Sequence, residues 1–290
     1  MTDGGAYSEW IGRVEEAEDS VPAQTARALA ATLDMDAAAR AGAGIAAGGP
    51  LPPLWHWLAF LPDAPMSALD LDGHPRRGGF LPPVPLERRM WAGGKLRWRG
   101  DLRIGETIHR RSEITAVSEK TGKTGRMVFV TVAHRISTAR GLAVTETQDI
   151  VYMPMPERFT PPPPIPAPGG DWVEPVPMDT ARLFRFSAVT FNAHRIHFDL
   201  AYAMKVEKYP GLVVHGPLQA ILLIEAARRH RAGAWPRGYT FRGVRPLLHT
   251  DALRLIGGAE TDGAQDLCTA TGEDYVCMQA RVDWTGIDGD

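Results

Sequence analysis

The chain has little cysteine, almost no net charge and no long uncharged apolar run. Only Cys268 and Cys277 are cysteines, and they form no CxxC pair, so we expect buried or half-buried thiols in a reducing cytoplasm. The formal net charge of -2 gives no general attraction to nucleic acid or to an anionic membrane. No run of about 18 apolar residues is free of charge, and the opening MTDGGAYSEW contains no basic, apolar signal region. These absences predict a cytoplasmic protein that binds neither nucleic acid nor a membrane.

The proline residues are unevenly distributed and divide the chain. With 44% hydrophobic and 23% charged residues among 290, the composition is that of a soluble globular protein long enough for two domains. The segment TPPPPIPAPGGDWVEPVP, residues 160–177, is too rich in proline to sustain a helix or a sheet. We therefore predict an N-terminal domain over 1–159, an extended linker over 160–178 and a C-terminal domain over 179–290.

The N-terminal domain combines helical segments with strands. Its alanine-rich beginning predicts helix within 7–47, and LPPLWHWLAFLP (51–62) predicts a short buried helix. The stretch 69–94, rich in glycine, proline and arginine, is expected to be a long loop. An antiparallel meander is predicted from three alternating runs, at 102–120, 124–139 and 141–155.

The C-terminal domain shows a similar order of helix and meander. Alternation over 183–190 predicts a strand, and a polar stretch and then a long apolar helix over 216–229 follow it. Four more strands are expected, at 239–246, 252–260, 267–272 and 275–285. Two halves with such a repeated plan would form a pseudo-dimer whose sheets pair edge to edge.

The long helix begins in a way that suits an anionic ligand. It starts at Gly216 and Pro217, where proline fits the first helical turn and glycine allows a close approach of the backbone. The free N–H groups of that turn and the helix dipole favour negative charge, such as a thioester oxygen that becomes an enolate. His197, in the preceding polar stretch, can supply acid or base chemistry at the same place.

Two runs, FNAHRIHFDLAYA and GLVVHGPL, carry a family resemblance. They resemble the hydratase motif of the MaoC-like, R-specific enoyl-thioester hydratases and dehydratases, roughly Gly-Asp-x-Asn-Pro-Ile-His-x-Asp. The family's catalytic histidine falls on His197 and the next aspartate on Asp199, but its catalytic aspartate falls on Asn192, whose amide cannot shuttle a proton. The Asn-x-His-Arg-Ile-His variant resembles the branch of mesaconyl-C4-CoA (3-methylfumaryl-CoA) hydratases and type 2 hydroxyacyl-thioester dehydratases.

The resemblance implies an α+β fold, the double hot-dog, in which two antiparallel sheets in one chain each wrap around a central helix. It places the site at the interface of the two halves, where the N-terminal domain would supply ligand walls and the C-terminal domain the chemistry. The ligand would be an acyl-CoA, bound without a cofactor and without a metal. A homodimer is compatible with the sequence.

Five residues are the catalytic candidates. We expect His197 to take a proton from water and Gly216 to donate its N–H group to the oxyanion. Asn192 would orient the water or cap the polar stretch, and His194 would donate a proton or face solvent. Asp199 would fix a ring tautomer or cap a short helix. His194, His197 and Asp199 also have the spacing of zinc ligands, but the resemblance implies a metal-free group.

Three candidates for substrate binding lie in the long loop. Arg88, Arg89 and Trp91 would suit the phosphates and adenine of coenzyme A, or would form a solvated basic rim. A substrate with a second carboxylate would also need an arginine, for which Arg195, Arg242 and Arg245 are candidates; the alternative is that they are surface or phosphate-binding arginines.

The expected function is reversible hydration and dehydration of a short-chain enoyl-CoA, with mesaconyl-C4-CoA the favoured substrate. His215, just before the long helix, would flank the thioester or only pack. One alternative is a broader 3-hydroxyacyl-thioester dehydratase that accepts uncharged acyl chains. The other is a non-catalytic acyl-CoA-binding subunit, to which the amide of Asn192 points.

Overall fold

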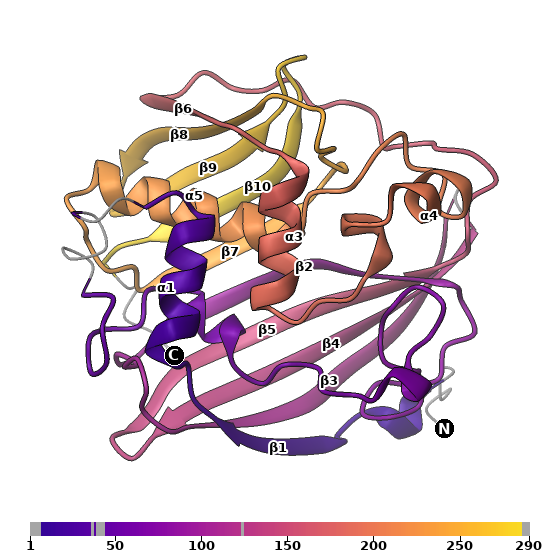
Figure 1. Cartoon of the computed structure of the whole chain (residues 1–290), viewed down its shortest axis with the longest axis horizontal. Coiled ribbons are helices and arrows are strands. Elements are labelled where there is room, and N and C mark those ends of the chain that lie inside the picture. The colour runs from indigo at the N-terminus through magenta and orange to yellow at the C-terminus, as the bar shows by residue number, and fades with distance from the viewer. Residues whose placement is uncertain (1–6, 36–37, 39–43, 123–124, 286–290) are drawn as a thin grey trace.

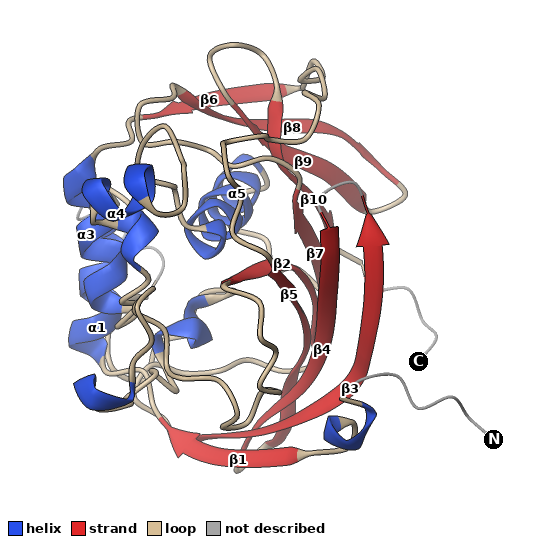
Figure 2. Ribbon diagram, turned by 90° about the vertical axis from the view of Figure 1, so that its right-hand side faces the viewer, coloured by secondary structure: helices blue, strands red, loops and turns tan. Residues whose placement is uncertain are grey.

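Figure 1 shows a computed structural model of the chain, which describes residues 7–35, 38, 44–122 and 125–285. Ten antiparallel strands form one curved sheet in the order β1-β3-β4-β5-β2-β7-β10-β9-β8-β6. The first five strands in that order belong to residues 7–159, called the first half below, and the last five to residues 160–285, the second half. In Figure 2 helices α1, α3, α4 and α5 all lie on the concave side of this sheet.

The described elements have the following bounds. The strands of the first half are β1 (Val14–Asp19), β2 (Arg88–Trp98), β3 (Ile108–Gly122), β4 (Gly125–Thr138) and β5 (Gly141–Met153). Those of the second half are β6 (Trp172–Val176), β7 (Gly238–Gly243), β8 (Leu253–Thr261), β9 (Ala264–Ala270) and β10 (Val276–Asp283). The α-helices are α1 (Ala23–Thr32), α3 (Thr180–Val189), α4 (Leu200–Lys205) and α5 (Gly216–His230). Short 3₁₀ helices are η1 (Ser8–Trp10), η2 (Trp55–Leu58), η3 (Met66–Ala68) and η4 (Arg195–His197).

The halves join through β2 and β7, the innermost strands of each. Their register runs from Gly93 opposite Arg242 to Arg97 opposite Gly238. A Cβ atom on Gly93 would lie 2.5 Å from the carbonyl oxygen of Phe241, so only glycine fits this close approach of two backbones. The predicted edge-to-edge pairing of the two sheets is confirmed.

Helix α5 fills the concave face of the second half. Every residue from Leu218 to Ala227 is buried, as expected for a helix that is apolar nearly all round, and α5 packs on β8, β9 and β10. The first half has no helix of this length among its described residues: α1 packs beside α3, and His56 and Trp57 of the four-residue η2 reach the sheet by hydrogen bonds to Glu146 of β5. No described helix is long and apolar enough to cross a membrane.

The predicted meander of the first half is confirmed as β3, β4 and β5, but its beginning differs from the prediction. Residues 14–19, in the acidic part of the segment whose composition favours helix, form β1, and their acidic side chains face arginines of β3 across the strand pair. The alanine-rich part that follows does begin a helix, α1, as predicted. Arg110 lies 3.6 Å from Glu15, and Arg111 lies 3.8 Å from Glu16. Part of the predicted helix, at 36–37 and 39–43, lies outside the described residues. The stretch 69–94 was expected to be entirely loop, but β2 begins within it at Arg88.

Two further predictions near the domain boundary are wrong. Residues 183–189 belong to helix α3 and not to a strand. Asp179 caps this helix by accepting the N–H of Arg182 at 2.7 Å, and Leu183 and Phe186 bury one face at helical spacing. The proline-rich segment does contain a regular element, because β6 pairs with β8 at the edge of the sheet. An edge strand tolerates Pro175, whose missing N–H is not needed there.

Candidate active site

A cavity of about 710 Å³ lies between the two halves. The first half borders it with the inner face of β2 to β5 and with the segment around η2, and the second half with α3, the polar stretch behind it and Pro217 of α5. Aromatic rings form much of the wall: Trp57 and Trp91 meet edge to face with centroids 4.8 Å apart, and Phe241 packs against both. A largely apolar cavity with a few polar groups is typical of a site for an organic ligand.

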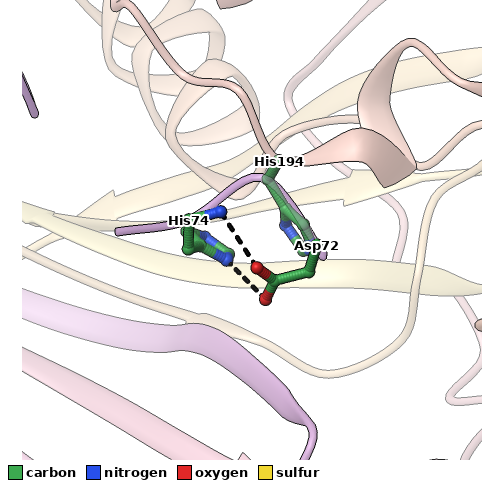
Figure 3. A group of neighbouring side chains, drawn as sticks. All are labelled: Asp72, His74 and His194. Carbon is green, nitrogen blue, oxygen red and sulfur yellow. Dashed lines mark hydrogen bonds and ion pairs between the residues drawn. The ribbon is translucent and has the colours of Figure 1, made fainter. Parts of the chain in front are cut away.

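A loop of the first half docks directly on the motif of the second half. Gly73 has φ +91°, and a Cβ atom there would lie 1.8 Å from the carbonyl oxygen of Ala193, so the two backbones touch. The N–H of Arg195 donates to the carbonyl oxygen of Asp72 at 2.9 Å. This docking brings the side chains of Asp72 and His74 beside His194 of the motif (Figure 3).

Asp72 and His74 form a hydrogen-bonded dyad. The ring Nδ1 of His74 lies 2.9 Å from Oδ2 of Asp72, and the backbone N–H of His74 donates to Oδ1 at 2.9 Å. Burial alone would raise the pKa of Asp72, but these bonds outweigh it and hold the pKa below its usual range. Burial lowers the pKa of His74 to about 4 in spite of its bond to Asp72. The dyad is therefore a carboxylate beside a neutral ring at neutral pH.

Four histidine rings follow one another from this dyad into the protein. The ring of His74 lies 4.2 Å from that of His194, which lies 5.2 Å from that of His197, and His197 stacks on His215 at 3.7 Å. Nδ1 of His197 donates to the carbonyl oxygen of Val213 at 2.7 Å. Nε2 of His215 lies 2.9 Å from the hydroxyl of Ser187.

Both inner rings are neutral. Burial lowers the pKa of His215 to about 3, and burial together with the neighbouring His215 and His194 lowers the pKa of His197 well below its usual value. A neutral imidazole whose Nδ1 carries the proton has its lone pair on Nε2 and is a proton acceptor. His197 has this tautomer, because its Nδ1 faces a carbonyl oxygen.

The structure places three predicted site residues on the cavity wall and others behind it. Asn192, Arg89 and Trp91 line the cavity. The side-chain oxygen of Asn192 accepts the N–H of His194 at 2.9 Å, which is the capping geometry that the sequence left as one option. His194, His197 and His215 are buried and do not border the cavity. Gly216 begins α5 next to the cavity-lining Pro217, so the positive end of the helix dipole faces the cavity.

The structure places the remaining predicted residues away from the cavity. Arg88 pairs with the buried Glu207 at 3.1 Å, so its charge is already matched inside the protein. Arg195 pairs with Asp199 at 2.7 Å. Asp199 also caps α4 by accepting the N–H of Tyr202 at 2.9 Å, which is the capping option that the sequence left open.

Arg242 differs from its expected position. It follows Phe241 on β7 and therefore extends from the other face of the sheet, where it is exposed and donates to Gln279 at 3.2 Å. A substrate carboxylate inside the cavity would be out of its reach.

A second polar cluster lies on the inner face of the first-half sheet. Glu146 is buried and accepts three hydrogen bonds, from His56 and Trp57 at 2.9 Å and from Gln148 at 2.8 Å. Burial alone would raise the pKa of Glu146, but the bond from His56 and the other donors lower it to about 2. The four side chains line the cavity, so its wall in the first half includes a buried carboxylate that is fully hydrogen-bonded.

One group of three described side chains has the composition of a metal site. Asp72, His74 and His194 offer ligand atoms that all lie within 4.8 Å of one another. Asp72 already accepts two bonds from His74, and Nε2 of His194 lies 3.3 Å from Oε1 of Glu207. The three side chains therefore belong to two separate hydrogen-bonded pairs, Asp72 with His74 and His194 with Glu207. Asp199, expected near any such site, points to Arg195 instead.

Sequence reasoning missed Asp72, His74, Glu146 and Glu207. The run LDLDGHP holds an aspartate and a histidine two residues apart, a spacing that allows an Asx-type turn with a ring bond, and this local signal was open to recognition. The two glutamates gave no such signal, because their histidine partners lie 90 positions away for Glu146 and 13 positions away for Glu207.

Comparisons with known proteins identify the family. The family model described as "Hydroxyacyl-thioester dehydratase type 2" matches residues 54–249. Mesaconyl-C(4)-CoA hydratase of Chloroflexus aurantiacus is 46% identical over 264 residues, which cover 88% of this chain and 90% of that protein. The chain belongs to the type 2 hydroxyacyl-thioester dehydratase family. Within it, the mitochondrial type 2 hydroxyacyl-thioester dehydratase of Schizosaccharomyces pombe is 29% identical over 237 residues, 71% of this chain and 77% of that protein.

Solved structures confirm the fold of this family member. HtdX of Mycobacterium tuberculosis matches with a TM-score of 0.64 at 17% identity, covering 92% of this chain and 98% of that one. Another Mycobacterium tuberculosis protein, described as a double hotdog fold, matches with a TM-score of 0.57 at 14% identity, covering 94% of this chain and 95% of that one. The predicted MaoC-like relationship and the predicted double hot-dog are therefore both confirmed.

Proposed function

We propose that the chain is a hydro-lyase that reversibly hydrates mesaconyl-C4-CoA (3-methylfumaryl-CoA). The observation that carries the proposal is the meeting, at one cavity, of the N-terminus of α5 with a row of four histidine rings that begins with His74 on the cavity wall. The 46% identity to the mesaconyl-C(4)-CoA hydratase supports the choice of substrate. The protein would act without a metal or a cofactor, in the cytoplasm, as a single chain or as a homodimer.

The geometry supports a simple division of labour. The thioester oxygen would lie at the start of α5, where backbone N–H groups and the helix dipole stabilise the negative charge of an enolate. Removing one such donor typically lowers kcat by about a hundredfold or more. A neutral histidine would take a proton from the water that attacks the β-carbon. Arg89, which lines the cavity and carries a positive charge, would interact with the coenzyme A phosphates or the substrate carboxylate.

The apolar part of the cavity wall supports a second candidate, a dehydratase with a broader range of acyl chains. Trp57, Trp91, Ile136 and Phe186 offer surface to an alkyl chain as readily as to a small dicarboxylic acyl group. The Schizosaccharomyces pombe relative is named for hydroxyacyl thioesters in general.

The test is the change in thioester absorbance when the purified protein is given mesaconyl-C4-CoA and crotonyl-CoA in parallel. We expect turnover of mesaconyl-C4-CoA with a higher kcat/KM. The His197→Ala variant should lose most of this turnover, because removing its ring opens the stacked histidine row. A preference for crotonyl-CoA would favour the broader dehydratase. No turnover of either substrate would overturn the enzyme proposals and leave the acyl-CoA-binding subunit.

A further inference from the structure

The amide at Asn192 leaves the site without the carboxyl group that the family motif supplies, and the loop of the first half brings a carboxylate to the same place. Asp72 is anchored there by its backbone, since its carbonyl oxygen accepts the N–H of Arg195 at 2.9 Å and Gly73 rests on Ala193. His74 follows on this anchored turn and borders the cavity together with Asn192. Asp72 and His74, about 120 positions earlier in the chain than Asn192, are therefore placed to take over the proton transfer of the missing carboxyl group.

We infer that His74, oriented by Asp72, is the catalytic residue that exchanges a proton with water and substrate in place of the absent motif carboxyl group. The inference rests on the proposed hydratase function. The inference assigns the proton transfer to the first half of the molecule, for which the sequence predicted only a role in lining the ligand site.

The tautomer of His74 suits this role. Asp72 is ionised and can only accept hydrogen bonds, so Nδ1 of His74, 2.9 Å from Oδ2, carries the ring proton. Nε2 then holds the lone pair, and no described residue donates a hydrogen bond to it. A carboxylate that fixes the ring in this way also stabilises the imidazolium that forms when Nε2 takes a proton.

The position of the ring separates His74 from the other histidines. His74 borders the cavity and its side chain keeps 24% of its exposure, whereas His194, His197 and His215 are buried behind it. A water or a substrate carbon in the cavity therefore meets His74 first. His194, whose ring centroid is 4.2 Å from that of His74, supports the ring from the other side.

The chemical step balances with water as the co-substrate. Nε2 of His74 takes one proton from water as the water oxygen forms a bond to the β-carbon, and the π electrons of the C=C bond move onto the thioester to give an enolate. The enolate oxygen lies at the N-terminus of α5. The proton on Nε2 then passes to the α-carbon, the thioester carbonyl re-forms, and the ring is neutral again. Dehydration follows the same path in reverse.

The experiment compares His74→Ala and His74→Gln with Asp72→Asn on mesaconyl-C4-CoA. Each variant should lower kcat/KM by about 10²- to 10⁴-fold, the usual range for removing a proton-transfer group. Asp70→Asn is the matched control, because its carboxylate lies in the same loop but faces Arg77, 3.9 Å away, and not His74. It should retain wild-type activity. Circular dichroism and thermal unfolding check that each variant is folded.

Three further readouts separate catalysis from a structural role. Added imidazole should restore part of the activity of His74→Ala, whose vacated space opens on the cavity, and none of that of His197→Ala, whose space is buried. Nitrogen NMR should find the proton of His74 on Nδ1 in the wild type and a changed tautomer in Asp72→Asn. Dialysis against a chelator should leave activity unchanged.

The outcomes also separate this inference from the proposed function. A wild type that hydrates the thioester while His74→Ala and His74→Gln stay within about threefold of it overturns the inference alone. So does one tightly bound metal ion per chain whose removal abolishes activity. A wild type that is inactive toward every enoyl thioester overturns both.

Discussion

The two halves have five strands each but fill the concave side of their sheet differently. In the second half, α5 packs on β8, β9 and β10 and forms a core of mainly apolar side chains with them. In the first half, loops and η2 take the place of a long helix, and a cavity and the buried carboxylate of Glu146 remain against β2 to β5. In two fused domains of similar fold, one half can thus be packed for stability while the other leaves space for a ligand, because the packed half stabilises the shared sheet.

The largest expected effect is on packing. Ile221 in α5 and Ile136 in β4 are both 1% exposed, but only Ile136 borders the cavity. Ile221→Ala should reduce the free energy of unfolding by about 3–5 kcal/mol, because the surrounding core cannot close the void. Ile136→Ala should cost at least about 1 kcal/mol less, since it enlarges a space that already exists. Urea unfolding measures both, and equal losses would mean that the first half is packed as tightly as the second.

The next effect concerns one buried glutamate in each half. Glu146 accepts hydrogen bonds from three donors, among them His56, and its pKa is lowered to about 2. Glu225 on α5 lies 3.2 Å from Arg228, but burial outweighs this partner and raises its pKa. Glu146→Gln should therefore cost about 3 kcal/mol, as for a buried pair that loses one member, and Glu225→Gln less than about 1 kcal/mol. Chemical unfolding at neutral pH distinguishes them.

The two glutamates should also respond to pH with opposite sign. The contribution of Glu146 is present above the unfolded pKa of about 4.5 and is lost as pH falls toward 2, because protonation breaks its bonds. The contribution of Glu225 is present below the unfolded pKa and is lost as pH rises through its higher folded pKa. Glu225→Gln removes a contribution that grows as pH falls, so it should make stability more sensitive to acid; a variant less sensitive to acid than the wild type would contradict the raised pKa.

The third effect comes from the neutral histidines. The pKa of His215 is about 3 in the folded chain, below its value in the unfolded chain. Below about pH 6.5 the unfolded chain therefore binds a proton on this ring and the native chain does not. Stability should fall with acid in this window by up to about 1.4 kcal/mol per pH unit for His215 alone. His215→Gln should make the fall less steep, as measured by unfolding at pH 7.5, 6.5 and 5.5. An unchanged slope would contradict a neutral buried ring.

How much of this was visible in the sequence depends on the range of the contacts. The start of α5 and the meander of β3 to β5 follow from local signals, a glycine and proline pair and strict alternation, and both were predicted. Helix α3 was read as a strand, because Arg182-Leu183-Phe184-Arg185-Phe186 satisfies both periods over so short a run.

The candidate site was predictable only in its second-half part. The motif gave His194 and His197, which are buried behind the cavity wall, and Gly216, which adjoins the cavity-lining Pro217. The contribution of Asp72 and His74 depends on the docking of a loop from more than a hundred residues away, which no local pattern records. Arg88 was expected to bind ligand because its buried partner Glu207 was not recognised.

The smallest expected effect comes from comparing two carboxylates near the motif, Asp72 of the first half and Asp199 of the second half. Asp199 caps α4, pairs with Arg195 and does not border the cavity. Asp199→Ala should therefore lower the thermal midpoint slightly through the lost cap, and should change kcat/KM by less than about threefold. Asp72→Asn perturbs the His74 ring on the cavity wall, so it should lower kcat/KM strongly and change the thermal midpoint only slightly. A large loss of turnover in Asp199→Ala would return the catalytic carboxylate to the second half, because a capping residue cannot produce that loss without unfolding the helix that it caps.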